Sequence, residues 1–571
     1  MTPVQPTRFR WAVPVYALAL ALAVTAPLLA PGYLLFRDAV STPLSFLSDS
    51  AIGLGEAAPR AVPQDFAIAV VSSVLDGGVI VKALLLAALA LAGWGAARLA
   101  GLLLPEASLP GQLVAATVAV WNPFVAERLL QGHWSLLVAY GCLPWVAAAV
   151  LRLRTETSSP SHWAALVFWI ALAGLTPTGV MLAATVAAVC VITPGSGVSR
   201  PRCAAAVLGT AVLTAGPWLA ASVLGGALGT SQEDGLAVFA ARAEPLLGTL
   251  GSLAGLGGIW NAAAAPHSRT SGFAMVGTVV LVAVVACGVP AVLRRRTGDP
   301  LLALAAFSIL TAAFLATPPG MSLLHRAVGA APGLAVLRDT QKWVALAMPG
   351  YALAGAGAVL VLGRWIRPGL AALICCAAVV AALPDLAWGV GGALRSVHYP
   401  PGWRQVATLI NADPQPVAVL PTGTMRRFAW SGPAPVLDPL PRWVRAEVLS
   451  PGDLLVAGRA VPGEGAHARD VQRLLLSGAD PAAVQRAGVG WVVVEAGTPG
   501  AMESADQTLR RLPVAYHDDD LTLYRVGGTD PAAAQGKRTT VILAHLLWAA
   551  LLVGAAMVLA AQSVPRPWRR S

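Results

Sequence analysis

Acidic, basic and aromatic side chains gather in four parts of the chain, and each part lies beside an apolar run. They are Arg37-Asp38 and the segments 122–134, 225–270 and 325–342. A carboxylate can take a proton from a hydroxyl group, and Arg or Lys can hold a phosphate as it leaves. Indole rings add flat apolar faces on which a sugar can stack. If the four parts converge, they form a cavity suited to transfer of a sugar from a lipid phosphate.

Asp38 is the expected general base, because it lies just beyond the first apolar run and would sit just above the membrane. The candidate ligands of the donor phosphate or the substrate are Arg37, Glu127, Arg128, His133, Trp134, Arg242, Trp260, Arg338 and Lys342. Among them, Arg128, Arg338 and Lys342 are the phosphate candidates. The two tryptophans are candidates for stacking on sugar rings.

Structural roles compete with these assignments. Asp38 could pair with Arg37 or cap a helix, and Glu127 could pair with Arg128 across a tight turn that we expect at residues 122–134. Those alternatives stay open at the level of the sequence.

The later candidates also have structural alternatives. Arg338 and Lys342 could snorkel to lipid headgroups, Arg242 could pair with Glu244, and Trp260 could belong to an aromatic belt. His133 could equally be a surface histidine.

The elements that must position these residues are set by composition. The 571-residue chain is 56% hydrophobic and 12% charged, with a mean hydropathy of +0.68, whereas soluble domains are about 25% charged. These values exclude a soluble enzyme, a disordered chain and a compact secreted module. The net charge of +11 comes from short clusters between apolar runs, so it does not indicate nucleic-acid binding.

Twelve apolar runs predict an α-helical, multi-pass membrane protein with about 12 transmembrane helices. The longer runs are 11–31, 77–100, 203–224, 271–292, 343–363, 368–388 and 539–561, and the shorter or interrupted ones are 109–124, 133–151, 163–175, 178–193 and 301–316. We expect the first to be an uncleaved anchor. The excess of arginine in alternate loops places both termini in the cytoplasm and the large loops 32–76, 225–270 and 317–342 outside the plasma membrane.

Three regions follow from this topology: a membrane core at 1–388, an outer α/β domain at 389–538, and a last helix with a basic cytoplasmic tail at 539–571. Strand-like runs at Val417–Leu420 and Trp491–Glu495 alternate with helical patterns in the outer region. The acidic stretch 517–520 is expected to be a turn rather than a metal site. The six cysteines lie in or beside apolar runs and imply neither disulfides nor zinc.

This layout resembles the GT-C superfamily of membrane glycosyltransferases. The stretches at 122–134 (Asn-Pro-Phe-Val-Ala-Glu-Arg-Leu-Leu-Gln-Gly-His-Trp) and 337–343 (Leu-Arg-Asp-Thr-Gln-Lys-Trp) resemble those of actinobacterial cell-envelope members. The resemblance implies a polyprenyl-phosphate donor carrying arabinose or mannose, and a cell-envelope glycan or lipoglycan as acceptor. It also implies that Asp38 is the base. Many members have two adjacent acids there, and Arg37 in place of one argues against a metal held by paired carboxylates. We therefore assign no metal ligand and no cofactor, although a divalent cation stays possible.

Two other functions remain open at this stage. A carrier or flippase of an envelope component also has many spans, but ion-coupled transporters need charges at membrane depth, and this chain has almost none. Residues 176–179 are expected to form the outer turn of a helical hairpin rather than a broken transporter helix. A non-catalytic relative that scaffolds envelope assembly is the third possibility.

Overall fold

Helices dominate the computed structural model, which describes residues 11–56, 58–225, 233–456, 458–528 and 535–563. Each predicted apolar run contains a helix. These are α1 (Ala12–Thr25), α4 (Gly77–Leu103), α5 (Ser108–Val120), α7 (Trp134–Thr155), α8 (Pro160–Ala173), α9 (Pro177–Val191), α10 (Arg200–Leu224), α12 (Phe273–Leu293), α13 (Asp299–Leu315), α15 (Met348–Leu362), α16 (Pro368–Ala381) and α23 (Gln535–Ser563).

In the described ranges, eight helices are long and apolar enough to cross a membrane, or ten if two bent helix pairs are each one span. The bends are 89° between α13 and α14 (Pro318–Ala330), and 74° between α16 and the segment Pro384–Gly391. α8 and α9 are apolar but shorter. The structure therefore shows a multi-pass helical protein, and the number twelve stays a prediction.

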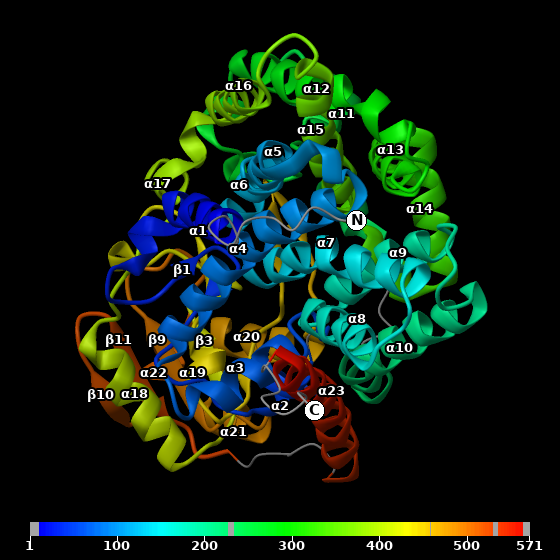
Figure 1. Cartoon of the computed structure of the whole chain (residues 1–571). Coiled ribbons are helices and arrows are strands. Elements are labelled where there is room, and N and C mark those ends of the chain that lie inside the picture. Colours follow the sequence, from blue (N-terminus) through cyan, green and yellow to red (C-terminus); the bar gives the residue numbers. More distant parts are fainter. Residues whose placement is uncertain (1–10, 57, 226–232, 457, 529–534, 564–571) are drawn as a thin grey trace.

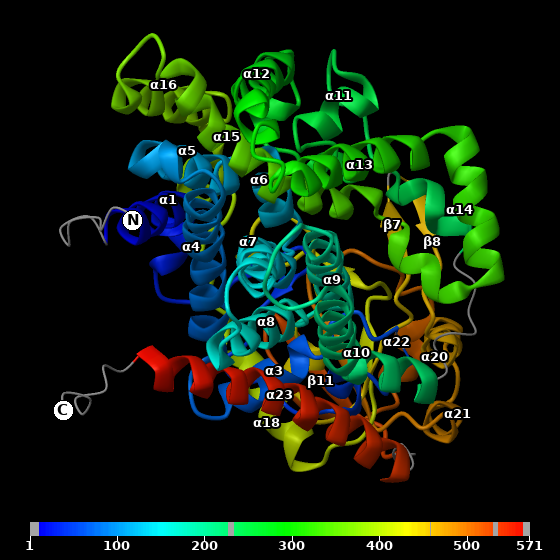
Figure 2. The same ribbon diagram turned by 45° about the vertical axis from the view of Figure 1, so that its right-hand side comes forward.

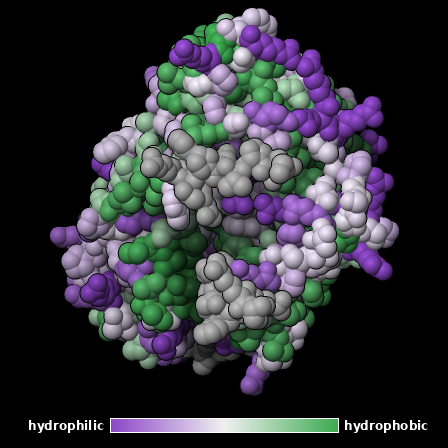
Figure 3. Space-filling model, viewed as in Figure 1, coloured by the Kyte–Doolittle hydropathy of each residue, from purple (hydrophilic) through white to green (hydrophobic). Residues whose placement is uncertain are grey.

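α5, α7 and α15 form the buried centre, and the other helices pack around them (Figures 1 and 2). α12 and α15 cross closely at Gly288, where a side chain would overlap the Ala354 carbonyl oxygen. The absence of a side chain on Gly288 permits this close approach. α23 lies against α8 and α10, as Figure 2 shows. Large apolar side chains such as Leu208, Phe307 and Met557 stay exposed. On the face shown in Figure 3, hydrophobic areas lie between hydrophilic ones, as expected for helices that contact lipid.

The expected tight turn at 122–134 is wrong: it is a buried helix, α6 (Pro123–Gln131). The Asn122 side chain accepts a hydrogen bond from the backbone N of Val125 at 3.2 Å, and proline stands at the first helical position. Gly132 ends the helix with φ 84°. A cap, a proline and a terminal glycine thus make nine residues helical where the charges indicated a turn.

The other large loops also contain regular structure. Residues 32–76 hold β1 (Leu35–Phe36), β2 (Ala39–Val40), α2 (Asp49–Ile52) and α3 (Gln64–Ser72). Residues 225–270 hold α11 (Gly248–Ala254) and the 3-10 turns Glu233–Phe239, Ala262–Ala264 and His267–Arg269. Residues 317–342 begin with α14 and continue as the 3-10 segments Pro332–Leu337 and Thr340–Ala347, the second of which leads into α15.

The region after α16 contains a five-stranded mixed sheet in the order β10-β11-β9-β3-β6. The strands are β3 (Val417–Leu420), β6 (Val448–Leu449), β9 (Trp491–Glu495), β10 (Val514–His517) and β11 (Leu521–Arg525). β3 is parallel to β6 and β9, whereas β11 is antiparallel to both its neighbours. The acidic stretch 517–520 forms the β10–β11 turn, as predicted from its sequence.

Helices cover both faces of this sheet. α18 (Pro401–Ala412) and Trp403 pack on one face, and α20 (Ala466–Leu476), α21 (Pro481–Arg486) and α22 (Ala505–Leu509) lie on the other. Smaller elements complete the region: β4 (Met425–Arg426), β5 (Val436–Leu437), α19 (Leu440–Trp443), β7 (Leu454–Val456) and β8 (Arg459–Val461).

The first loop is joined to this α/β region through backbone hydrogen bonds. The N–H of Arg37 donates to the carbonyl of Pro435 at 3.1 Å, and the N–H of Leu437 donates to the carbonyl of Arg37 at 2.8 Å. Leu35 and Val40 share an apolar core with Trp403. Although the two segments are about 400 residues apart, they fold as one unit at the place where Asp38 lies.

Candidate functional site

A cavity of about 1510 Å³ lies between the first loop, the ends of the central helices and the α/β region. Among the residues proposed from sequence, those that line it are Arg37, Asp38, His133, Trp134, Trp260, Arg338 and Lys342. Glu127, Arg128 and Arg242 do not line this cavity. The structure thus brings most of the four sequence segments together, as their residue types suggested.

Asp38 stands in the two-residue turn between β1 and β2. Its backbone N–H donates to the carbonyl of Gln131 at 3.2 Å. Gly132 lies against the same turn, where a Cβ atom would come within 2.4 Å of the Ala39 nitrogen. The close approach and the positive φ of Gly132 both require glycine. The end of α6 therefore fixes the height of Asp38 in the cavity wall.

The Asp38 carboxylate has one anchored oxygen. Oδ2 accepts hydrogen bonds from Gln131 Nε2 at 3.1 Å and from His133 Nε2 at 3.0 Å. The side chain is 34% exposed and faces the cavity. Burial would raise the pKa of Asp38, but the hydrogen bonds from His133 and Gln131 and the charge of Lys342 outweigh it, so the pKa lies below its ordinary value. Asp38 is therefore ionised at neutral pH.

His133 is held in one tautomer by its second neighbour. Its Nδ1 lies 3.0 Å from Nη1 of Arg128, and a guanidinium can only donate. Nδ1 must therefore accept, and the ring proton is on Nε2, which donates to Asp38. Burial, together with the charges of Lys342 and Arg128, lowers the pKa of His133 although Asp38 favours its charged form. His133 is thus a neutral donor that holds the Asp38 carboxylate.

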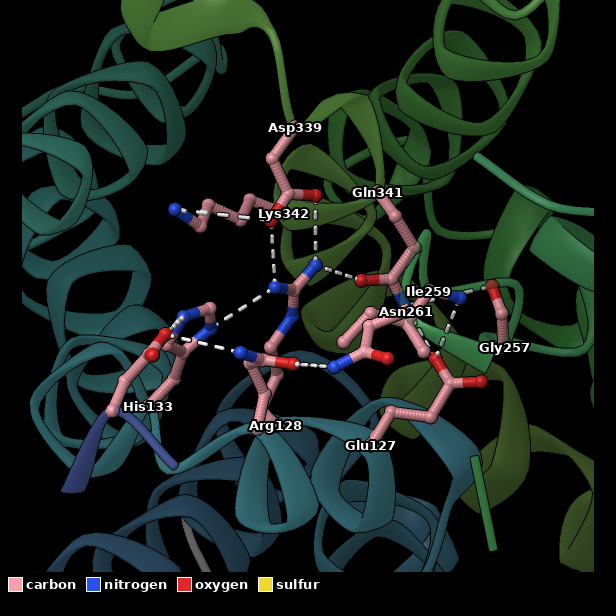
Figure 4. Close-up of polar contacts among 11 residues, drawn as sticks. Glu127, Arg128, His133, Gly257, Ile259, Asn261, Asp339, Gln341 and Lys342 are labelled. Carbon is pink, nitrogen blue, oxygen red and sulfur yellow. Dashed lines mark hydrogen bonds and ion pairs between the residues drawn. The ribbon is translucent and has the colours of Figure 1, made fainter. Parts of the chain in front are cut away.

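Arg128 lies behind the cavity wall, fully buried. Its Nη1 and Nη2 donate to the two carboxylate oxygens of Asp339 at 2.8 and 3.1 Å, and Nη2 also donates to Gln341 (Figure 4). Burial opposes ionisation of Asp339, but Arg128 keeps its pKa well below the ordinary value. The expectation that Arg128 binds phosphate is not supported, because its guanidinium is already paired with protein groups.

Glu127 is also fully buried and holds a loop in place. Its carboxylate accepts from the backbone N–H of Gly258 at 3.0 Å. It also accepts from the backbone N–H of Ile259 at 3.1 Å and from Gln341 Nε2 at 3.0 Å (Figure 4). This loop leads directly to Trp260 in the cavity wall. Glu127 therefore has a structural role, and it does not make the substrate contact that was considered from the sequence.

Arg242 points elsewhere. Its side chain donates to the Ala243 carbonyl, and its backbone N–H donates to Gly258. Glu244, its expected partner, instead forms a buried ion pair with Arg269. The structure thus separates Arg242 from the site and assigns Glu244 to the packing of the loop.

A group of basic and aromatic residues lines the same cavity as Asp38. The Trp260 ring packs edge-to-face on Phe239 with centroids 4.7 Å apart, and Arg338 lies over the other ring of that pair, 4.3 Å from the centroid of Phe239. Burial, then the charge of Arg60, lowers the pKa of Arg338 to about 10. Lys342 Nζ lies 3.8 Å from Asp339 Oδ2, and its side chain is 26% exposed. Trp134 lines the cavity but is almost fully buried.

Three amides were missed by the sequence reasoning. Gln131 holds Asp38, Asn261 Nδ2 donates to Gln131 Oε1 at 2.8 Å, and Gln341 joins Arg128 to Glu127. All three lie within segments that were proposed for their charged residues. Their amide side chains are neutral, so a criterion based on ionisable groups does not select them. Across the described ranges, no group of three or more His, Cys, Asp or Glu side chains is arranged to hold a metal ion.

Comparison with known proteins gives a match in structure only. No family model matches the sequence, and no curated protein does so. The cryo-EM structure of arabinofuranosyltransferase AftD from Mycobacteria matches with a TM-score of 0.60 and 16% identity, over 93% of this chain. A structure of an AftD variant matches with a TM-score of 0.54 and 17% identity, also over 93%. This chain spans only 40% of the first AftD chain and 42% of the second. At these identities the likeness shows the fold alone: the chain shares the fold of the AftD structures over nearly its whole length.

Proposed function

We propose that the protein transfers a sugar from a polyprenyl-phosphate carrier to a cell-envelope glycan or lipoglycan on the outer face of the plasma membrane. The observation that carries this proposal is the ionised Asp38, fixed by His133 and Gln131 in a cavity that Lys342 and Arg338 also line. The GT-C fold agrees with glycosyl transfer in general. The fold likeness to an arabinofuranosyltransferase makes arabinose the first donor sugar to test, with mannose second.

Asp38 is the general base in this mechanism. In the described part of the chain, both side-chain hydrogen bonds to its carboxylate reach Oδ2, so Oδ1 is the oxygen left for substrate. The acceptor hydroxyl oxygen forms a bond to the anomeric carbon as its proton passes to Oδ1. The bond from that carbon to the phosphate oxygen breaks, and the electron pair leaves with the polyprenyl phosphate. One displacement of this kind inverts the anomeric centre.

The donor phosphate is assigned to the side of the cavity that holds Lys342 and Arg338. Lys342 belongs to the candidate membrane span Thr340–Leu362, close to its beginning, which is the height at which a lipid phosphate meets the protein. Its ammonium group and the Arg338 guanidinium stabilise the negative charge that develops on the leaving group. Trp260 offers a partly exposed aromatic edge to the sugar.

Sugar transfer by the purified protein in nanodiscs tests the proposal. Polyprenyl-phosphate arabinose, mannose and glucose would be offered with envelope-glycan acceptors. We expect Asp38→Asn to lower transfer at least about 100-fold while donor binding and thermal stability persist, because positioned bases contribute about 100-fold or more. Asp519→Asn is the matched control, since Asp519 is exposed in the β10–β11 turn, and it should keep full activity.

Other outcomes would contradict the proposal. Full transfer by the Asp38→Asn protein would place the base elsewhere. Absence of both transfer and donor binding in the unaltered protein would overturn glycosyl transfer and favour a transporter or a scaffold.

A further inference from the structure

A second positive surface lines the cavity on the side of the α/β region. It consists of Arg37, Arg395 and Arg427, which we name the arginine rim. All three surround residues 431–437, which also contribute to the cavity wall. Nη1 of Arg427 donates to the Pro433 carbonyl at 3.2 Å, and the N–H of Arg37 donates to the Pro435 carbonyl at 3.1 Å. Arg395 lies beside Gly432: a Cβ atom added to this glycine would be 3.6 Å from Nη2 of Arg395.

The rim is not neutralised by the acids around it. Besides Asp38, six acids line the cavity: Glu56, Asp65, Asp339, Asp438, Glu447 and Glu464. Four of them are paired with other arginines: Asp65 with Arg442, Asp339 with Arg128, Asp438 with Arg426, and Glu464 with Arg60. Glu56 accepts a hydrogen bond from the backbone N–H of Ala468. Asp38 is bonded to His133. Within the ranges that the structure describes, no ion pair joins a rim arginine to a carboxylate.

Arg37 is the buried member of the rim. It is 8% exposed, and its Nη2 donates to the Ala263 carbonyl at 2.8 Å. Its Nε has no hydrogen-bond partner among the residues that the structure describes. Burial lowers its pKa, and the nearby charge of Arg427 lowers it further although Asp38 opposes this. The like charges of Arg37 and Arg427 repel each other, and an anion bound between the guanidinium groups would offset that repulsion.

The rim and the donor side both adjoin Asp38, but different parts of the chain build them. Lys342 influences Asp38 from the beginning of a membrane span, whereas Arg37 adjoins it on the side of the α/β region. In a single displacement the acceptor hydroxyl attacks the anomeric carbon from the face opposite the leaving phosphate, and the general base contacts that hydroxyl. If the lipid phosphate occupies the Lys342 side, the acceptor occupies the rim side.

We propose that the arginine rim binds an anionic group, a phosphate or a carboxylate, on the acceptor glycan or lipoglycan. The identity of the ligand as the acceptor rests on the proposed function, but binding of an anion at the rim can be tested without turnover. Guanidinium groups suit this task because they bind oxyanions in a bidentate manner.

Direct binding to the full-length protein in a phosphate-free maltoside detergent tests the site. The probes are mannose 6-phosphate and methyl glucuronide for the rim, methyl mannoside as a neutral sugar, and farnesyl phosphate for the donor side. We expect the double variant Arg395→Gln, Arg427→Gln to weaken binding of at least one anionic sugar about 10-fold, since each charge-assisted hydrogen bond lost has an effect of that order. Farnesyl phosphate binding should stay within about twofold of the unaltered protein.

Two further variants keep the test sharp. Lys342→Met should show the opposite pattern, with farnesyl phosphate weakened and the anionic sugars unaffected. Arg404→Gln with Arg486→Gln removes two exposed arginines of the same α/β region that lie outside the cavity, and this control should change neither. Of the two anionic sugars, the one that the rim variant weakens identifies phosphate or carboxylate as the preferred group.

Three results would overturn the inference. One is binding of both anionic sugars at the unaltered level by the rim variant. Another is equal binding of the neutral sugar. The third is parallel loss of farnesyl phosphate and the anionic sugars, which would show one shared phosphate site. A failure of Asp38→Asn to lower transfer would leave these binding results as they stand and would count against the proposed function alone.

Discussion

Two sets of charged residues lie at and behind the wall of the same cavity, and the protein compensates their charges to different degrees. The buried set behind the cavity wall, Glu127, Arg128 and Asp339, has its charged groups bonded to one another, to Gln341 and to backbone N–H groups. The cavity-facing set, with Asp38, Lys342 and the arginine rim, keeps charge that its protein neighbours only partly compensate. The difference separates residues that build the cavity wall from those that we propose to meet a ligand, although their types are the same.

Arg128→Met should have the largest effect on stability. It leaves the buried carboxylate of Asp339 with Lys342, 3.8 Å away, as its remaining ion-pair partner among the described residues. Removing one partner of a buried ion pair costs about 3–5 kcal/mol, so we expect a loss of folded protein. Thermal unfolding and fluorescence-detected size exclusion measure it. Arg486→Met is the control for an exposed arginine. A stable Arg128→Met protein would remove the distinction between the two sets.

Lys342→Met should have a smaller effect on stability and a larger one on substrate. Lys342 also neighbours Asp339, but at 3.8 Å and with a partly exposed side chain, so its loss should cost about 1 kcal/mol or less. The KM for the lipid-linked donor should rise about 10-fold through the loss of one charge-assisted contact. Donor titrations at fixed acceptor concentration measure this. A large stability loss with unchanged KM would move Lys342 into the structural set.

His133→Leu should give the smallest effect, and it is visible in the pH dependence. The hydrogen bond from His133 is the chief contribution that lowers the pKa of Asp38 against burial, so its removal raises that pKa. A base with a lowered pKa stays active above that pKa and loses activity as the pH falls through it. The acid limb of the pH–rate profile should therefore move to higher pH in His133→Leu.

His133→Gln is the rescue variant, because its amide can again donate to Asp38. It should return the acid limb towards that of the unaltered protein. At neutral pH the rate of His133→Leu should fall about 10-fold or less. An unchanged profile in both variants would show that Gln131 alone positions the base.

Much of the architecture could be predicted because membrane helices need long apolar runs, which are visible in the sequence. Each of the twelve runs contains a helix. α6 was missed, although Asn122, Pro123 and Gly132 are helix-end signals, because its charged residues favoured an exposed turn. The choice between paired and unpaired charges could not be predicted. It depends on contacts such as Arg128 with Asp339, which are 211 residues apart, and short-range patterns carry no information on such pairs.

The backbone bonds between Arg37 and residues 435–437 set an order of events in the making of the protein. The turn with Asp38 emerges from the ribosome early, but the strand that brackets it is synthesised about 400 residues later, at about 5–20 residues per second. During that interval of tens of seconds the nascent chain has the turn of Asp38 but not residues 435–437, which bond to Arg37. The cavity is therefore complete only near the end of synthesis, and a chain truncated before residue 435 would lack most of its α/β wall.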